Sequence, residues 1–480
     1  MAIEFGTDGW RAVISDEFTF ENVRRVAWAI GDYLDEKYGI NNASVVVGFD
    51  TRFLSDRYAI EMSRLLSARG FSVHLSESDC PTPALTYAIL DKKATAGIMI
   101  TASHNPPRYN GIKLKAHHGG SVLPEEAHRV EHFISHPATD TAKYKALWAS
   151  EPGVLTPEDH VERFNPMPSY LIHVRSLIDA TVISRRRPRV VVDSMYGAGR
   201  GYIRRYLEEI GCEVQEIHAE MNPGFGGIHP EPIERNLRAL IETVRVGGYD
   251  LGVATDGDAD RIGAVDENGR FVDPHCIISL VLRHLVEKRG WRGSVVKTVS
   301  TTQMVSRLAA RYGLPLHETP VGFRHISEIM QRENVLIAGE ESGGITIQHH
   351  IPEGDGILMG LLLAEILAYE KKPLSAIIQD LMRETGFFYY RRQDVKTRAF
   401  DRVSLVAQLT ANAPVELAGH RIVQVDKRDG IKYLLDDESW LLIRPSGTEP
   451  LLRIYAEARS PEIVEALLAT GAQLANRSMA

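Results

Sequence analysis

Short apolar runs alternate with amphipathic stretches along most of the 480 residues, and this alternation constrains the fold more than any other feature of the sequence. Runs such as 44–49 (SVVVGF) and 96–100 (AGIMI) are short and almost entirely apolar, which favours buried strands. Strands that are apolar on both faces and separated by helices are typical of parallel sheets covered on both sides. Further strands are expected at 71–75, 189–193 and 212–214, and helices at 56–69 and 201–210.

The strand–helix cycle starts again near residues 44, 189 and 293, so the sequence predicts three similar α/β/α units with mixed, mostly parallel sheets. From about residue 385 the chain becomes richer in charge, and a final helix near 461–474 completes a smaller C-terminal α+β unit. A typical domain has ~150 residues, so three domains are expected from the length, with two or four as alternatives. The predicted units are 1–150, 151–268, 269–384 and 385–480, with a proline-containing linker at 135–160 and a helix near 159–178.

Composition narrows the class of protein. Lys and Arg number 55 against 63 Asp and Glu, and the net charge of −8 gives no general attraction to nucleic acid or anionic membranes. Cys80, Cys212 and Cys276 are too few and too scattered for a disulfide framework, and the first residues lack the features of a secretory signal. The longest apolar stretch, 357–367, contains Glu365 and falls short of the ~20 residues that span a bilayer, so a buried helix is predicted. We expect a cytoplasmic protein, monomeric or homodimeric, with no nucleic-acid or membrane partner.

The segment 101–107 (TASHNPP) is the sharpest local signal. It follows an expected strand, and open α/β sheets bind ligands at the carboxyl ends of their parallel strands. Ser103 is therefore a candidate nucleophile, with Lys113 ten residues further along the chain. A polar turn fixed by proline explains the same residues equally well. His104 does not form a catalytic pair with Ser103 by adjacency alone, because neighbours in a loop seldom face each other.

A second segment, 256–261 (DGDADR), follows an apolar run and places three carboxylates at alternate positions. Asp256, Asp258 and Asp260 would repel one another without a cation, and oxygen ligands of this kind suit Mg²⁺. An EF-hand loop shares the spacing but needs glycine at its sixth position, where this chain has Arg261. A solvated acidic turn is the alternative, and we favour the metal site.

Two further loops combine glycine, hydroxyl groups and charge. Residues 444–450 (RPSGTEP) place small polar residues beside Arg444, a pattern that binds anions through backbone amides and a guanidinium group. Residues 339–344 (GEESGG) follow an apolar run, and Glu340 and Ser342 can form hydrogen bonds with sugar hydroxyl groups. Ordinary hydrophilic or glycine-rich turns remain alternatives for both loops.

Two other patterns are interpreted as structural. Residues 197–201 (GAGRG) follow a strand, but their GxGxG spacing differs from the dinucleotide-binding GxGxxG, so a tight turn is predicted. The pairs His117-His118 and His349-His350 have no recognisable metal-ligand partners in the sequence and are expected at the surface.

Taken in order, these segments resemble the signature loops of the α-D-phosphohexomutase family along essentially the whole chain. Residues 5–11 (FGTDGWR) resemble its N-terminal signature and 101–107 its phosphoserine loop. The other matches are 256–261 with its metal loop, 339–344 with its sugar-binding loop and 444–450 with its phosphate-binding loop. The resemblance implies three similar α/β/α domains and a smaller C-terminal domain around one central cleft.

The resemblance also implies an activity, the reversible transfer of phosphate between C1 and C6 of a hexose through a phosphoserine and a bisphosphorylated sugar. Its implied cofactors are Mg²⁺ and, as activator, glucose 1,6-bisphosphate. The implied metal ligands are Ser103, Asp256, Asp258 and Asp260. The implied catalytic residues are Ser103, Lys113, Arg11, His104 and His325. The implied substrate-binding residues are Glu340, Ser342, Gly322, Arg324, Arg261, Lys297, Arg444, Ser446, Gly447, Thr448 and Arg453.

The general acid and base are less well defined. Residues 319–325 (TPVGFRH) resemble a substrate loop in which glucose-type members carry lysine at the place of Arg324. Arginine stays protonated and cannot act as a base, so Lys113 and His325 are the candidates, followed by His104.

The sequence leaves the preferred hexose open. The loop ending in Gly344 looks more like glucose-type phosphoglucomutases than phosphoglucosamine mutases, because some mannose and glucosamine members carry histidine there. Phosphoglucomutase activity, with mannose phosphates as further substrates, is the main hypothesis. The alternatives on the same fold are a phosphomannomutase, a phosphoglucosamine mutase and a glucose 1,6-bisphosphate synthase. A Mg²⁺-dependent sugar phosphatase and a non-catalytic sugar-phosphate binding module are more remote alternatives.

Overall fold

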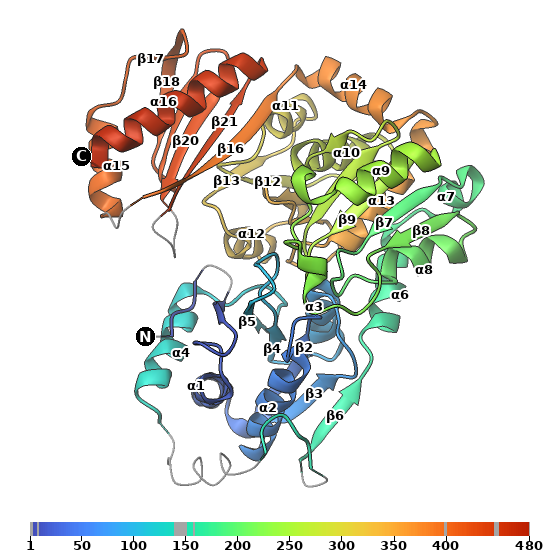
Figure 1. Cartoon of the computed structure of the whole chain (residues 1–480), viewed down its shortest axis with the longest axis vertical. Helices are drawn as coiled ribbons and strands as arrows, with labels where there is room; N and C mark the ends of the chain where they lie inside the picture. The colour runs from blue at the N-terminus through green and yellow to red at the C-terminus, as the bar shows by residue number, and fades with distance from the viewer. Residues whose placement is uncertain are drawn as a thin grey trace.

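The computed structural model describes residues 3–6, 9–138, 151–156, 159–397, 401–445 and 451–479. Four β-sheets follow one another along the chain, and helices pack on each of them (Figure 1). The first three sheets are mixed and the last is antiparallel, which confirms the prediction of three α/β/α units and a C-terminal α+β unit. In Figure 1 the first unit lies at the bottom and the C-terminal unit at the top left.

The first unit has a six-stranded sheet in the order β1-β5-β4-β2-β3-β6, in which β4, β2, β3 and β6 are parallel. Val45, Val46 and Val47 of its central strand are fully buried, as a sheet covered on both faces requires. Its strands are β1 (Trp10–Val13), β2 (Ser44–Phe49), β3 (Ser72–Ser76), β4 (Ala96–Ile100), β5 (Tyr109–Ala116) and β6 (Val161–Phe164). Its helices are α1 (Phe20–Tyr38), η1 (Ile40–Asn42), α2 (Ser55–Ala68), α3 (Thr82–Asp91) and α4 (Pro124–Ser135).

The strand β6 differs from the sequence prediction. It pairs with β3, so the first sheet extends past the expected unit boundary at residue 150. A helix expected over 159–178 begins only at Met167, since Pro166 favours an extended chain before it and Pro168 suits the first turn of a helix. The four unit boundaries themselves stay predictions.

The second unit has a five-stranded sheet in the order β11-β10-β9-β7-β8, with β9, β7 and β8 parallel. Its strands are β7 (Val190–Asp193), β8 (Val214–Ile217), β9 (Leu251–Thr255), β10 (Ile262–Asp266) and β11 (Phe271–Val272). Its helices are α6 (Met167–Leu177), α7 (Ala180–Arg186), α8 (Tyr202–Glu209), η2 (Phe225–Gly227), η3 (Glu234–Asn236) and α9 (Arg238–Gly247).

The third unit has a four-stranded sheet in the order β13-β12-β14-β15, of which only β15 is antiparallel to its neighbour. Its strands are β12 (Ser294–Thr298), β13 (Leu316–Thr319), β14 (Val335–Gly339) and β15 (Ile345–Ile347). Its helices are α10 (Pro274–Glu287), α11 (Gln303–Arg311), α12 (Phe323–Met330), α13 (Gly356–Glu370) and α14 (Leu374–Thr385).

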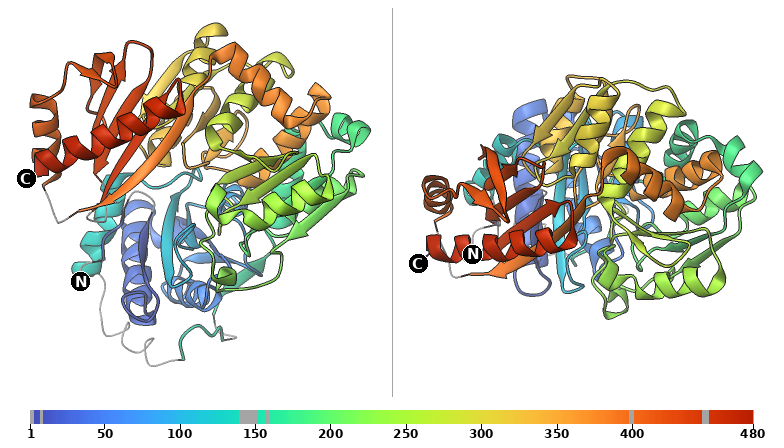
Figure 2. Two further views of the ribbon diagram at one scale, coloured as in Figure 1. Left: turned by 45° about the horizontal axis from the view of Figure 1, so that its top comes forward. Right: turned by 90° about the horizontal axis from the view of Figure 1, so that it is seen from above.

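The fourth unit is an antiparallel sheet in the order β16-β21-β20-β19-β18-β17, and α16 lies across its strands (Figure 2). Its strands are β16 (Tyr389–Lys396), β17 (Glu416–Leu417), β18 (His420–Asp426), β19 (Ile431–Leu435), β20 (Trp440–Pro445) and β21 (Leu451–Ala458). Its helices are α15 (Arg402–Ala411) and α16 (Pro461–Met479).

The second and third units share one hydrophobic core, and α13 lies within it. This helix contains the apolar stretch that the sequence predicts to be buried, and Glu365 at its centre is fully buried. The Glu365 carboxylate is held by His284 Nε2 at 2.7 Å, Arg289 Nη1 at 2.8 Å and the Asp179 backbone N–H at 2.7 Å, so its charge is compensated. Within the described ranges, no helix has both the length and the apolar character needed to cross a membrane.

Candidate active site

Three loops that follow parallel strands meet where the first three units come together. Ser103 lies beyond β4, Asp256 directly after β9 and Glu340 directly after β14, at the carboxyl ends that parallel strands share. Ser103 Oγ donates a hydrogen bond to Asp256 Oδ2 at 2.9 Å. The Ile262 backbone N–H donates to Gly343 O at 3.2 Å, which joins the third loop to the second unit.

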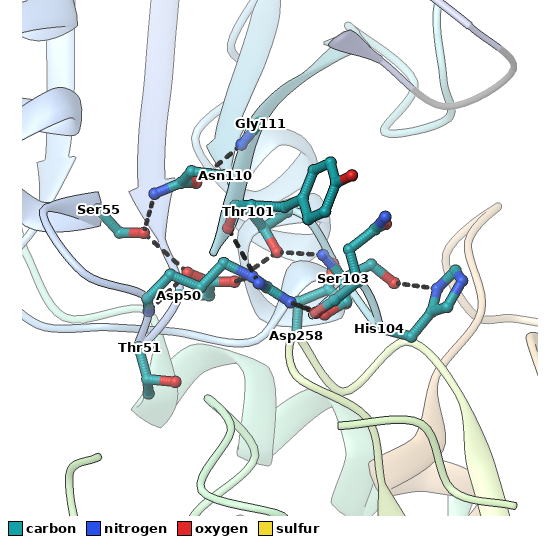
Figure 3. Close-up of polar contacts among 12 residues, drawn as sticks. Asp50, Thr51, Ser55, Thr101, Ser103, His104, Asn110, Gly111 and Asp258 are labelled. Carbon is teal, nitrogen blue, oxygen red and sulfur yellow. Dashed lines mark hydrogen bonds and ion pairs between the residues drawn. The ribbon is translucent and has the colours of Figure 1, made fainter. Parts of the chain in front are cut away.

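The Ser103 loop has an unusual backbone. Ser103 is fully buried with a φ of +51°, a left-handed conformation that is unfavourable for residues other than glycine. Its backbone N–H donates to Thr101 Oγ1 at 2.9 Å, and its Oγ lies 3.3 Å from His104 Nδ1 (Figure 3). Arg11 Nη1 donates to Asn105 Oδ1 at 2.9 Å, so the N-terminal segment contacts the same loop.

Two residues that hold this loop escape prediction from the sequence. Arg52, which lies just beyond β2, is buried, forms an ion pair with Asp50 and donates hydrogen bonds to the Ser103 loop. Asp50 also accepts a hydrogen bond from Thr101 Oγ1 at 2.6 Å (Figure 3). The sequence does contain a pattern that could have indicated them. Residues 50–52 follow the strand β2, which is parallel to β4, so they lie at the same edge of the sheet as Ser103.

The acidic triad is buried and compact. Asp256, Asp258 and Asp260 each offer a carboxylate oxygen, and these atoms lie within 4.8 Å of one another. Burial and the neighbouring carboxylates of Asp260 and Asp258 raise the pKa of Asp256 well above its ordinary value. A divalent cation would relieve that repulsion, so the donor set fits Mg²⁺. Lys113 Nζ lies 2.9 Å from Asp258 Oδ2 and 2.7 Å from Asp260 Oδ2, and Thr82 Oγ1, which the sequence does not single out, donates to Asp258 at 2.6 Å.

Glycines allow the metal-loop candidate to approach the Ser103 loop. A Cβ at Gly257 would lie 2.5 Å from Ser103 O, and one at Gly197 would lie 2.7 Å from Asp256 O. The Ala198 backbone N–H donates to Gly257 O at 2.9 Å. The glycine-rich segment predicted as a tight turn therefore packs against the acidic loop and supports it.

Several arginine side chains act electrostatically on His104. Burial, together with Arg261 and Arg11, lowers the pKa of His104 well below its ordinary value, and Arg392 and Arg453 act in the same direction. The His104 ring is therefore neutral at neutral pH, and one of its nitrogens can accept a proton.

The loop after β14 closes on itself and joins the start of α12. The Glu340 backbone N–H donates to Gly344 O at 3.0 Å, and Glu340 Oε1 accepts a hydrogen bond from the Gly322 backbone N–H at 2.8 Å. Ser342 lies in the same turn and is half-buried. A Cβ at Gly344 would lie 3.4 Å from the ring of Phe323.

The other candidates of the third unit lie at the start of α12 and on β12. Arg324 Nε donates to His325 Nε2 at 3.4 Å, and burial and the Arg324 charge lower the pKa of His325. Lys297 on β12 is buried, and its Nζ donates to two backbone carbonyls of the following loop at 3.2 and 3.1 Å. Burial and the Lys432 ammonium lower the pKa of Lys297 to about 8. A substrate contact for Lys297 stays a prediction.

In the C-terminal unit, Arg444 and Arg453 lie directly opposite each other on the antiparallel strands β20 and β21. Arg444 Nε donates to Asp429 Oδ2 at 2.7 Å, whereas the buried Arg453 Nε donates no hydrogen bond within the described ranges. Two cross-strand guanidinium groups repel each other unless an anion lies between them. The other predicted phosphate-binding residues lie outside the described residues: Ser446, Gly447 and Thr448.

One expectation about the histidine pairs is wrong, since the side chain of His350 is buried. Its Nε2 lies 2.7 Å from Asp355 Oδ2, and its Nδ1 lies 2.9 Å from His173 Nε2. Tyr170 OH donates to the same Asp355 oxygen at 2.6 Å. These partners come from α6 and from the start of α13, a proximity that sequence spacing could not indicate.

Comparison with known proteins identifies the family. The chain matches the phosphoglucomutase/phosphomannomutase family, with α/β/α domain I at residues 2–140, domain II at 168–269, domain III at 273–385 and the C-terminal domain at 403–473. It is 34% identical over 475 residues to a phosphoglucomutase/phosphomannomutase of Thermococcus kodakarensis, covering 99% of each chain. It is 31% identical over 468 residues to a phosphoglucosamine mutase of Carboxydothermus hydrogenoformans, covering 96% of each. A crystal structure from Thermus thermophilus, of a protein named as a phosphomannomutase, superposes with a TM-score of 0.84 at 35% identity and covers 99% of each chain.

This fold, with a buried serine beside an acidic triad, defines a phosphohexomutase, an isomerase that moves phosphate within a hexose phosphate. The chain belongs to the phosphoglucomutase/phosphomannomutase family of these enzymes. The family that the signature loops predict is thereby confirmed.

Proposed function

We propose that this enzyme interconverts glucose 1-phosphate and glucose 6-phosphate through a phosphoserine at Ser103 and glucose 1,6-bisphosphate, with mannose phosphates as further substrates. One observation carries the proposal. The Ser103 hydroxyl is buried, lies 2.9 Å from Asp256 of the acidic triad and lies 3.3 Å from His104 Nδ1. Phosphoryl transfer depends mainly on positioning and on stabilisation of charge, and this arrangement supports both.

Mg²⁺ would be held by Asp256, Asp258 and Asp260, with an oxygen of the phosphorylated Ser103 as a further ligand. When bound, the ion offsets negative charge on the transferring group. Lys113 and Arg261 flank the triad and would hold its orientation, since Lys113 Nζ contacts two of the carboxylates and the Arg261 backbone N–H donates to Asp256 Oδ1 at 3.2 Å.

Proton transfer would fall to side chains around Ser103. His104 Nδ1 lies 3.3 Å from Ser103 Oγ, so it is placed to take the proton that leaves the attacking sugar hydroxyl, and its lowered pKa makes it a weaker base than an ordinary histidine. Lys113 is paired with carboxylates and would supply positive charge or return a proton. Arg11 would add charge on the other side of the loop through its contact with Asn105.

The third and fourth units would recognise the substrate. Arg444 and Arg453 face each other across two strands and would bind the phosphate that does not react. Glu340 and Ser342 would read the sugar hydroxyl groups, with Gly322 and Arg324 beside them. Because each phosphate must visit both ends of the site, the sugar has to be recognised in two orientations.

Two classes of hexose phosphate are candidate substrates for this site. Gly344 adds no side chain to the sugar loop, which favours glucose because the loop then resembles that of glucose-type phosphoglucomutases. The names of the relatives divide unevenly: the Thermococcus protein supports glucose and mannose phosphates, whereas the Carboxydothermus protein and most other relatives at 30–32% identity support glucosamine phosphate. Phosphoglucosamine mutase activity is therefore the second candidate.

A coupled assay with glucose, mannose and glucosamine 1-phosphates, with and without glucose 1,6-bisphosphate, tests the proposal. We expect the highest kcat/KM for glucose 1-phosphate, activation by the bisphosphate, and a loss of at least ~10³-fold in the Ser103→Ala variant. A higher value for glucosamine 1-phosphate would select the second candidate. Full activity of Ser103→Ala would refute the phosphoserine, accumulation of the bisphosphate would indicate a synthase, and steady phosphate release would indicate a phosphatase.

A further inference from the structure

Arg52 is a buried cation whose side-chain donors are all engaged inside the protein. A guanidinium group has five N–H donors. Nε donates to Asp50 Oδ2 at 3.1 Å, and Nη1 donates to the carbonyls of Pro106 at 2.9 Å and Tyr109 at 3.0 Å. Nη2 donates to Asn105 O at 2.7 Å and to the carbonyl of Ser103. No donor remains for a substrate, so the contribution of Arg52 lies in the loop that it holds.

A second set of hydrogen bonds holds the other side of Ser103. Asp50 Oδ2 accepts from Thr101 Oγ1 at 2.6 Å, and the same Thr101 oxygen accepts from the Ser103 backbone N–H at 2.9 Å (Figure 3). Asp50 Oδ1 accepts from Ser55 Oγ at 2.8 Å and from the Arg52 backbone N–H at 2.9 Å. Both the N–H and the C=O of Ser103 are therefore tied to the Asp50–Arg52 pair.

The second unit covers this pair. The ring of Phe225 lies 4.9 Å from the Arg52 guanidinium carbon, a cation–π contact that shields the charge from water. Thr51 Oγ1 donates to Tyr196 O at 2.9 Å in the same junction. The left-handed backbone of Ser103 is thus held by contacts from two units.

We infer that Arg52 is a positioning residue for the Ser103 nucleophile, an inference that rests on the proposed phosphoserine mechanism. By fixing four carbonyls of the loop, Arg52 holds the unfavourable backbone of Ser103 and keeps its Oγ against Asp256. A lysine at this position carries the same charge, but a single ammonium with three donors cannot span the same carbonyls.

The Arg52→Lys variant tests this role, with Arg69→Lys as a matched control. Arg69 lies at the end of α2, where it pairs with Asp32 at 2.8 Å, donates to the Trp28 carbonyl at 2.7 Å and stacks on the Trp28 ring, away from the Ser103 loop. We expect Arg52→Lys to lower kcat by ~100-fold with KM changed less than ~3-fold, because displacement of the nucleophile slows the chemical step. Arg69→Lys should keep kcat within ~2-fold. Equal effects in the two variants, or a raised KM with unchanged kcat in Arg52→Lys, would overturn the inference.

Thr101→Val is a milder second variant, because it keeps the side-chain shape and removes the oxygen that links Asp50 to the Ser103 N–H. It should lower kcat by ~10-fold without a comparable change in KM. An unchanged kcat would show that the hydrogen bonds from Asp50 through Thr101 to the Ser103 N–H do not position the serine.

Hydrogen exchange separates this inference from the proposed function, because it needs no turnover. The backbone amides of residues 103–105 and 108–110 should exchange at least ~10-fold faster in Arg52→Lys than in the unaltered chain, while those of α1 stay unchanged. Unchanged exchange at 103–110 would overturn the positioning role. Failure of the unaltered chain to convert any hexose phosphate would instead overturn the proposed function, and the exchange result would still decide whether Arg52 holds the loop.

Discussion

The two sides of the candidate site are built in opposite ways. The transfer side, formed by Ser103, the Asp50–Arg52 pair and the acidic triad, is buried at the junction of the first two units, and glycines bring its loops into contact. The recognition side, formed by Glu340, Ser342 and Arg324 with the Arg444–Arg453 pair, is spread over the third and fourth units, and all of these residues except the buried Arg444 are half-buried.

The difference follows from what each side has to do. Charge interactions are strongest where water is excluded and where groups do not move during the reaction, which suits the transfer of a phosphoryl group. A sugar that must present either end needs side chains that can exchange partners, and half-buried groups lose less when they do so. Changes on the transfer side should therefore affect kcat, and changes on the recognition side should affect KM.

The largest expected effect is on the transfer side. Asp256→Asn should lower kcat by ~10³-fold and raise the Mg²⁺ concentration needed for activity, because a neutral amide holds the cation poorly. Asp266→Asn is a control, since Asp266 is also buried in the same unit but, within the described part of the chain, accepts hydrogen bonds from the backbone N–H groups of Asn268 and Arg270 in its own turn and contacts neither Ser103 nor the triad. Steady-state kinetics over a range of Mg²⁺ measure both, and an unaltered Mg²⁺ dependence in Asp256→Asn would argue against a metal in the triad.

The addition of a single methyl group at Gly257 should also disrupt the transfer side and lower kcat. Gly257→Ala places a Cβ 2.5 Å from Ser103 O, so the two loops must separate and kcat should fall by ~100-fold. At Gly290 the added methyl meets open space, although the φ of +66° is unfavourable for alanine, so Gly290→Ala should lower the melting temperature slightly and leave kcat within ~2-fold. If kcat survives in Gly257→Ala while the melting temperature holds, close contact between the loops is not required.

On the recognition side the effect should be smaller and of a different kind. Arg444→Lys removes the planar fork that contacts Asp429 and faces Arg453, so KM should rise ~10-fold with kcat within ~3-fold. A fall in kcat at constant KM would contradict the division between the two sides. Arg428→Lys is a nearby control, because Arg428 contacts Asp426 and Glu318 instead.

The smallest effect is expected at His173 on α6. Its ring stacks on Tyr87 of the first unit and forms a hydrogen bond with His350 of the third. Burial and His350 lower the pKa of His173 to about 4 from 6.5, so its folded form stays neutral. Between those values the unfolded chain binds the extra proton, and stability should fall as pH drops from about 6.5 to about 4. His173→Gln should flatten this dependence by about 2 °C in melting temperature. If the melting temperature changes with pH in the same way in His173→Gln and in the unaltered chain, another group is responsible for the pH dependence of stability.

Much of this architecture can be predicted from local patterns. The strand 96–100 matches β4 residue for residue, and the apolar run 44–49 matches β2. The errors arise where partners are distant in sequence. The strand β6 is a short polar segment that forms only because β3 offers a free edge, and His350 is buried because α6 packs against it.

The sequence by itself determined the fold class, the family and the positions of the signature loops, because apolar periodicity and short motifs are local properties of the chain. Only the tertiary structure decided how the buried charges are compensated. The role of Arg52 in holding the Ser103 loop becomes evident only when β2 and β4 lie side by side in the sheet. Lys113 reaches the acidic triad only because the first two units meet, with Gly257 allowing their loops to come into contact. Electrostatic energies depend on distances between side chains and on the exclusion of water, and folding alone sets both.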